Sequence, residues 1–398
     1  MRNKKTKMIL IKIISISFLV FILMQPMSTS QDTNINNNCL NKKIIRVAIL
    51  NAVIPTFISP ENNIKALDNY EWKIENQTYT FKVKWITDAQ IRNGRLSRRN
   101  FDVLIIPGIG KEFRFIYDGR LAIWKNQIKR FVSQGGGYFG MCGGANMAVA
   151  DQISYEARGF KTTTLWEFCM RRASLGLVEA NSYQDMANPY TSSILLRNPS
   201  RTGISTFIYY NFTEQGVGIS ANLSINISHP IFQGYPYPNR LMRWNSGPAL
   251  IPFSDNVSVL ASYPKENFTG PNGSPFTTIH TWQYVGPLSG MFLKQRSFDF
   301  WDKEEILETH LAGKPAAIAD NYGDGRVVVF GPHPEHPVYF NEKIVESEDS
   351  DNNHMYFGDR LYQKTWTSEN ATYNWWIIRR SVAWAAKIPD EALPPIEL

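Results

Sequence analysis

The chain has 398 residues, of which 43% are hydrophobic and 13% aromatic, and this composition excludes an intrinsically disordered protein. No segment repeats at a fixed period, which excludes a solenoid. The net charge of +7 falls to +2 without the five basic residues of the first 12 positions, so the remaining chain has little electrostatic reason to bind nucleic acid.

The amino terminus has the pattern of an export signal. Basic residues precede an apolar run over residues 13–24, and Ser28 and Ser30 provide small side chains for cleavage near position 30. Residues 1–30 are therefore expected to be a signal peptide, or alternatively an uncleaved anchor that enters the membrane through residues 8–24. Either outcome places the protein outside the cell or on the outer surface of the cell membrane.

Eight acceptor triplets for N-glycosylation support export independently and predict a glycoprotein. Their asparagines are Asn76, Asn211, Asn222, Asn226, Asn256, Asn267, Asn272 and Asn370. An Asn-rich sequence also generates such triplets by chance, so both interpretations stay open.

The three cysteines, Cys39, Cys142 and Cys169, allow at most one disulfide. If Cys39 pairs with Cys169 outside the cell, Cys142 remains a reduced thiol. A nucleophilic cysteine requires that state.

Strand and helix patterns alternate after a polar spacer over residues 31–43. Short, mostly aliphatic runs predict strands, and segments with helical periodicity or small residues predict helices. The predicted strands cover residues 44–50, 80–86, 102–106 and 138–141, and the predicted helices cover residues 119–134 and 143–150. Such alternation predicts an α/β fold with a doubly wound, mostly parallel sheet.

Residues 151–299 interrupt this alternation with six of the eight acceptor asparagines, many aromatic residues and turn signals. They predict a long β and loop insertion, which either elaborates the carboxyl edge of the sheet or forms a separate small domain. The alternation returns with a hairpin over residues 316–330 and a helix over residues 369–387. We therefore expect one domain over residues 44–390 and an unstructured tail over residues 391–398.

Cys142 lies where the predicted strand 138–141 passes into a helix, between small residues on both sides. A nucleophile on such a tight turn needs small neighbours, because the turn is strained and crowded. The amino terminus of the following helix also favours a thiolate and offers backbone N–H groups. Cys142 is therefore the candidate nucleophile, although free cysteines are also common as inert buried residues.

His333 and Glu335 follow the predicted strand 326–330 on one loop. The imidazole could take the thiol proton, and the carboxylate could fix the tautomer of the imidazole. Because Cys142 and His333 both follow strands of the sheet, we expect them to meet at the same edge. A metal site that includes His336 is the weaker alternative for this loop, and we expect no metal and no cofactor.

Backbone N–H groups for an oxyanion are predicted on two segments. The loop after strand 102–106 contains Gly108 and Gly110, whose small size lets the backbone approach a substrate. The N–H of Gly143, directly after Cys142, is the second predicted donor.

The sequence around these residues resembles the class I glutamine amidotransferase-like superfamily. Residues 140–144 (GMCGG) fit the GxCxG elbow of that family, and residues 333–335 (HPE) are similar to its HPE motif. Residues 135–145 (GGGYFGMCGGA) and 244–248 (WNSGP) resemble most closely the group related to the amino-terminal domain of biotin-protein ligase. The resemblance implies a flavodoxin-like fold, with Cys142 as acyl-forming nucleophile, His333 as base and Glu335 as its partner.

The resemblance, together with the export signal and the lack of a recognisable synthetase segment, favours hydrolysis over amidotransfer. The expected activity is cleavage of a glutamine-like or γ-glutamyl amide bond in a small molecule or peptide, through an acyl-enzyme. A catalytically silent extracellular binding module on the same scaffold is the alternative. Asn245 and Gly247 either line the substrate pocket or form a simple turn.

Overall fold

The computed structural model describes part of the chain. The described residues are 41–51, 59–108, 121–152, 174–183, 206–209, 212–213, 216–217, 219–244, 247–265, 278–283, 301–306, 311–340, 343–346, 362–365 and 368–398. The predicted export signal, Cys39, Cys169, Gly110 and Asn245 lie outside them. Within the described residues, no helix is both long and apolar enough to cross a membrane.

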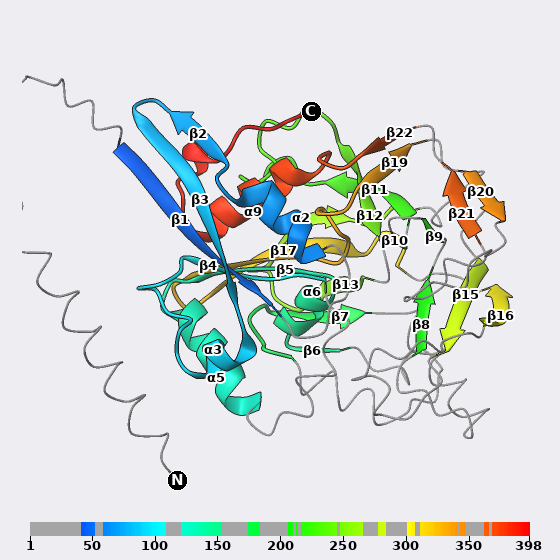
Figure 1. Cartoon of the computed structure of the whole chain (residues 1–398), viewed down its shortest axis with the longest axis horizontal. Helices are drawn as coiled ribbons and strands as arrows, with labels where there is room; N and C mark the ends of the chain where they lie inside the picture. Colours follow the sequence, from blue (N-terminus) through cyan, green and yellow to red (C-terminus); the bar gives the residue numbers. More distant parts are fainter. Residues whose placement is uncertain are drawn as a thin grey trace, which may run out of the picture. The chain divides into compact units, whose positions relative to one another are not determined.

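A ten-stranded sheet forms the centre of the fold (Figure 1). From one edge to the other its strands are β12 (Asn239–Trp244), β11 (Ile219–Ile225), β14 (Ser258–Ser262), β17 (Pro315–Tyr322), β18 (Gly325–Phe330), β5 (Gly137–Met141), β4 (Val103–Ile106), β1 (Asn41–Leu50), β3 (Gln77–Ile86) and β2 (Glu71–Ile74).

The sheet is mixed rather than mostly parallel, which corrects the sequence prediction. The five strands from β18 to β3 are parallel to one another. The remaining pairs, from β12 to β18 and between β3 and β2, are antiparallel. The pairs β2–β3 and β17–β18 are hairpins with two-residue turns, whereas a helix lies along the chain between β1 and β3, between β3 and β4, and between β4 and β5.

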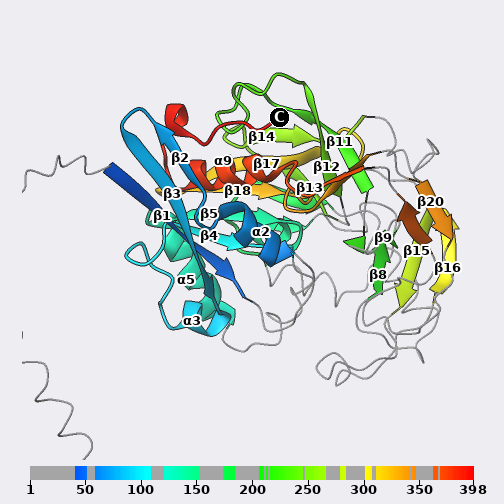
Figure 2. The same cartoon turned by 45° about the horizontal axis from the view of Figure 1, so that its top comes forward.

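Helices cover both faces of the parallel strands (Figures 1 and 2). On one face lie α2 (Ser59–Leu67) and α9 (Trp375–Ala385), and on the other lie α3 (Asp88–Arg92), α5 (Leu121–Ser133) and α6 (Gly143–Ala148). The alternation of a strand explains how β1 serves both cores. Val47 and Ile49 belong to the buried cluster that includes residues of α9, whereas Ala48 and Leu50 belong to the cluster that includes residues of α5.

Strands β11, β12 and β14, which come from residues 151–299, extend this sheet beyond β17. Other described segments pair in smaller sheets. These are β6 (Asp151–Gln152) with β7 (Ala180–Tyr183) and β13 (Ala249–Pro252); β8 (Thr206–Tyr209) with β15 (Thr278–Gln283) and β16 (Trp301–Ile306); β9 (Phe212–Thr213) with β10 (Gly216–Val217); β19 (Val338–Phe340) with β22 (Ser368–Asn370); and β20 (Lys343–Glu346) with β21 (Tyr362–Thr365).

The carboxyl-terminal segment differs from its prediction in two ways. Helix α9 begins at Trp375 and not at residue 369, because residues 368–370 form a strand and Asn374 uses its side chain to bind β12. The tail is also ordered: a 3-10 turn covers Asp390–Ala392, and Leu393 is buried. The tail is held because the guanidinium of Arg380 in α9 donates hydrogen bonds to the carbonyl of Pro394 in the tail and to the carbonyl of Ile231.

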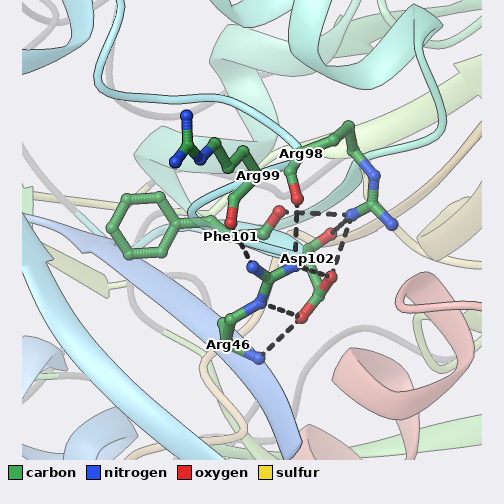
Figure 3. Close-up of polar contacts among 5 residues, drawn as sticks. All are labelled: Arg46, Arg98, Arg99, Phe101 and Asp102. Atoms are coloured by element: carbon green, nitrogen blue, oxygen red, sulfur yellow. Dashed lines mark hydrogen bonds and ion pairs between the residues drawn. The ribbon is translucent and has the colours of Figure 1, made fainter.

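An ion pair joins β1 and β4 at the end of the sheet where β4 begins (Figure 3). Asp102, one residue before β4, accepts hydrogen bonds from the backbone N–H of Arg46 at 2.9 Å and from its guanidinium at 2.8 and 3.0 Å. Arg98 donates to the carbonyl of Asp102 at 3.0 Å. Burial opposes ionisation of Asp102, but the bonds from Arg46 outweigh it and lower the carboxyl pKa. These contacts fix the register of β1 against β4.

Candidate active site

Cys142 occupies a strained turn between β5 and α6. Its φ is 50° and its ψ is −106°, a conformation that residues other than glycine rarely adopt. The N–H of Cys142 donates to the carbonyl of Phe330 at 2.8 Å, and its own carbonyl accepts from Asn146 at 3.0 Å. Cys142 is a reduced, half-buried thiol. The turn is therefore tied both to the helix that follows and to the end of β18.

The small residues beside Cys142 are required by packing. A Cβ atom on Gly144 would lie 2.0 Å from the carbonyl oxygen of Ile106, so only glycine lets α6 approach β4 this closely. The hydroxyl of Tyr138 donates to the carbonyl of Gly144 at 2.6 Å and holds the first turn of α6 against β5. The glycine-rich sequence around Cys142 thus builds the tight turn that it predicted.

His333 and Glu335 form a buried pair on the loop after β18. His333 Nδ1 and Glu335 Oε1 lie 2.7 Å apart, and the two residues are 4% and 0% exposed. The backbone N–H of His333 donates to the carbonyl of Arg243 in β12 at 2.7 Å. With Nδ1 bound to the carboxylate, the ring presents Nε2 as its other reactive atom.

Gly108, directly beyond β4, brings the imidazole and the thiol together. A Cβ atom on Gly108 would lie 2.4 Å from Cε1 of His333 and 3.4 Å from Cβ of Cys142. Both side chains therefore border the same small space. Residues from the ends of β4, β5 and β18 meet there, as expected for the carboxyl edge of parallel strands.

The charges of this group favour a protonated imidazole. Burial alone would lower the pKa of His333, but the negative charges of Glu335 and of a Cys142 thiolate outweigh burial and raise it to about 10. His333 Nε2 is buried. The sulfur of Cys142 raises the pKa of His333 through its charge and through side-chain hydrogen bonding, so the ring and the sulfur interact directly.

His336 lies against the pair and stays neutral. Its ring centroid is 4.7 Å from that of His333, and its Nε2 is 3.8 Å from Glu335 Oε1. Burial, with the positive charges of His333 and Arg243 added, lowers the pKa of His336 to about 3 against the attraction of Glu335. A neutral ring at this place avoids a second positive charge beside the imidazolium.

The same three side chains could also hold a metal ion. One ligand atom from each of His333, Glu335 and His336 lies within 4.8 Å of the others, and imidazole with carboxylate suits zinc. A metal at this place would have to replace the proton between His333 and Glu335. Metal binding and a protonated His333–Glu335 pair are therefore mutually exclusive.

The remaining predicted residues have different positions. Gly143 is the first residue of α6, so its N–H belongs to the groups that have no acceptor within the helix. Gly247 packs on the histidine loop, because a Cβ atom there would lie 1.8 Å from the carbonyl oxygen of Gly331. That contact makes Gly247 a packing position at the base of the loop. Gly110 and Asn245 lie outside the described residues.

Sequence reasoning missed two residues that position the loop. Arg243, which is 2% exposed, supplies the carbonyl that holds the backbone of His333, and the hydroxyl of Tyr263 donates to the carbonyl of Pro248 at 2.9 Å. Both lie in the segment predicted as an insertion. Their periodicity is that of ordinary strand residues, so no local signal distinguished them.

No model of a known protein family matches the sequence, and no curated protein matches it. Several solved structures are similar. They include PurLQS from Thermotoga maritima (12% identity, 73% of this chain and 88% of that chain, TM-score 0.34), a glutamine amidotransferase (12% identity, 73% and 90%, TM-score 0.34) and a β-galactosidase from Bacillus circulans sp. alkalophilus (10% identity, 73% and 28%, TM-score 0.32). Likenesses this distant assign neither a family nor an activity.

Proposed function

We propose that the chain is an exported hydrolase that cleaves an amide bond of the glutamine or γ-glutamyl type through a thioester on Cys142. The proposal rests on one observation: the buried His333–Glu335 pair, bonded at 2.7 Å, borders the same space beside Gly108 as the strained Cys142. A thiol, a base and a carboxylate that orients the base are the three parts of a cysteine-dependent acyl transfer. The proposed scaffold is a flavodoxin-like amidotransferase domain of the biotin-protein ligase-related group.

In the first half of the proposed reaction, the Cys142 thiolate attacks the carbonyl carbon of the substrate amide. The carbonyl oxygen becomes an oxyanion, which the N–H groups of Gly143 and of the loop at Gly108 and Gly110 stabilise. The imidazolium of His333 then gives its Nε2 proton to the leaving nitrogen. The carbon–nitrogen bond breaks, an amine or ammonia leaves, and the acyl group stays on sulfur as a thioester.

In the second half, the now neutral His333 takes a proton from water, and the resulting hydroxide attacks the thioester carbon. The carbon–sulfur bond breaks, the carboxylic acid leaves, and the thiolate–imidazolium pair is restored. Glu335 keeps Nδ1 protonated throughout, so that Nε2 exchanges the catalytic proton. The reaction uses no metal or cofactor.

A catalytically silent binding module is the second candidate. The observation that favours it is the burial of His333, which is 4% exposed. If a substrate cannot reach the imidazole, the site would bind an amide without cleaving it. The two candidates differ in the reactivity of Cys142 and not in the fold.

An electrophilic glutamine analogue tests the proposal. The native protein and a urea-unfolded sample are treated with the analogue, and alkylation of the peptide that contains Cys142 is followed by mass spectrometry. The proposal predicts faster alkylation in the native protein, and a loss of that advantage in His333→Gln. Equal rates in native and unfolded samples would exclude the acyl-enzyme route and favour the binding module.

A further inference from the structure

The described acceptor triplets share an exposed position. Their asparagines are Asn76, Asn222, Asn226, Asn256 and Asn370, and all five are exposed. The buried asparagines of the described residues, by contrast, lie outside such triplets; they are Asn62, Asn63, Asn146 and Asn374. The serine or threonine of each described triplet is also exposed or half-buried. Exposure therefore makes these triplets accessible to a transferase, except that the amide of Asn226 already donates to the carbonyl of Val259 at 2.9 Å.

Asn76 lies at one edge of the ten-stranded sheet. It is in the turn that joins β2 to β3, next to Glu75, which has a φ of 51°. The last pair of this hairpin is Ile74 with Gln77, and β2 is the outermost strand. A group attached to Asn76 would therefore extend from the tip of the edge hairpin.

Asn222 lies beside the other edge. Along β11 the burial alternates, with Ala221, Leu223 and Ile225 buried and Asn222 and Ser224 exposed. Both residues that define the triplet thus face solvent on the same side of the strand. Asn222 pairs with Leu241 of β12, the outermost strand.

Edge strands are a hazard, because their unpaired N–H and C=O groups can pair with the edge of another molecule. Within the described residues, the outer side of β2 pairs with no strand. The outer side of β12 is already covered, because the carbonyls of Asn239, Leu241 and Arg243 accept hydrogen bonds from Tyr235, Asn374 and His333. A bulky hydrated group beside the β2 edge would oppose pairing there. Asn76 belongs to the described triplet at the β2 edge, and Asn222 to the described triplet beside the covered β12 edge.

We propose that Asn76 and Asn222 carry N-linked oligosaccharides and that the oligosaccharide on Asn76 shields the β2 edge of the sheet from pairing with another copy of the chain. In the transfer, the amide nitrogen of the asparagine bonds to the first sugar carbon of a lipid-pyrophosphate-linked oligosaccharide. The bond from that carbon to the pyrophosphate breaks, the amide loses a proton, and the lipid pyrophosphate leaves. This inference rests on the export proposed above and is independent of the chemistry of Cys142.

The experiment uses the full chain with its own leader in a eukaryotic secretory host. The protein from the medium is deglycosylated enzymatically in heavy-oxygen water, and the label at each asparagine is read by mass spectrometry. The proposal predicts label at both Asn76 and Asn222. A chain retained in the cytosol, or a secreted chain without label at these two asparagines, would overturn it.

Matched variants test the shielding role. Thr78→Ala with Ser224→Ala removes both triplets and leaves the asparagines in place, whereas Thr78→Ser with Ser224→Thr alters the same positions and keeps the triplets. The alanine pair is expected to lose two glycans and to self-associate at lower concentration in light scattering, with unchanged native-state alkylation of Cys142. Equal self-association of the two pairs, with both folded by circular dichroism, would refute shielding.

Discussion

The substitution Gly108→Ala should disable the thiol site while leaving the fold in place. The added methyl group would lie 2.4 Å from Cε1 and 3.0 Å from Nδ1 of His333. Non-bonded carbon atoms normally stay about 3.5–4.0 Å apart. Either the imidazole or the loop at residue 108 must therefore move by roughly 1 Å to admit the methyl group.

A shift of about 1 Å in a catalytic group lowers the rate by roughly 100-fold, so Gly108→Ala is expected to slow both hydrolysis and the alkylation of Cys142 by about that factor. The stability loss should be that of an overpacked site, about 1–3 kcal/mol in the free energy of unfolding. The imidazole is the group most directly displaced, because the new methyl group keeps an ordinary contact of 3.4 Å with Cβ of Cys142.

The assay is the rate of native-state alkylation of Cys142 by the electrophilic glutamine analogue, together with urea unfolding. Gly136→Ala is the matched control, because its methyl group would meet Phe131 at 2.5 Å, at the opposite end of β5 from Cys142. Gly136→Ala should lose comparable stability and keep the thiol reactivity. Wild-type reactivity in folded Gly108→Ala would refute the arrangement described for His333 and Cys142.

Three further predictions concern charges. The rate of amide hydrolysis should fall as the pH rises through about 10, where His333 loses its proton. Glu335→Gln should move this fall to lower pH, because it removes a negative charge that raises the pKa of His333. A fall at the same pH in Glu335→Gln would contradict the pairing of His333 with Glu335. The pKa of His336 is lowered to about 3 from its ordinary 6.5, so between these pH values the unfolded chain binds a proton at this ring and the native chain does not. The stability that this difference contributes above pH 6.5 should therefore be lost as the pH falls toward 3. Urea titrations should show a smaller acid loss in His336→Asn, and an equal loss would exclude His336 as its source. Asp102→Asn should lower the free energy of unfolding by about 1.5–3 kcal/mol, because it weakens the hydrogen bonds from Arg46. Alkylation of Cys142 should be unchanged. An unchanged urea unfolding curve would show that the pair of Arg46 and Asp102 does not stabilise the fold.

The sequence predicted the central parallel strands β4 and β5 well because each is buried on both faces. Residues 103–106 and 137–141 are buried throughout, so their apolar or small character is visible without a partner strand. Helix α2 was not predicted, because Asn62 and Asn63 are buried there and break the usual apolar pattern. The ordered tail was also missed, since its position depends on distant contacts of α9 such as those of Arg380.

The candidate site was predictable to the extent that its parts follow strands. The His333–Glu335 bond is local to one loop, and Cys142 reaches it through the parallel pairing of β5 with β18. The support from β12 was not predictable. It depends on a bridge between Arg243 and His333, residues far apart in the sequence, whose pairing follows from the register of antiparallel strands.

Trapping the acyl-enzyme tests the central claim most directly. The protein is mixed with a γ-glutamyl amide, quenched in acid and digested, and the peptide that contains Cys142 is weighed by mass spectrometry. The account predicts a glutamyl thioester on that peptide, removable by hydroxylamine and absent from Cys142→Ser. Hydrolysis of the amide without an adduct on Cys142, and with equal rate in Cys142→Ser, would contradict it.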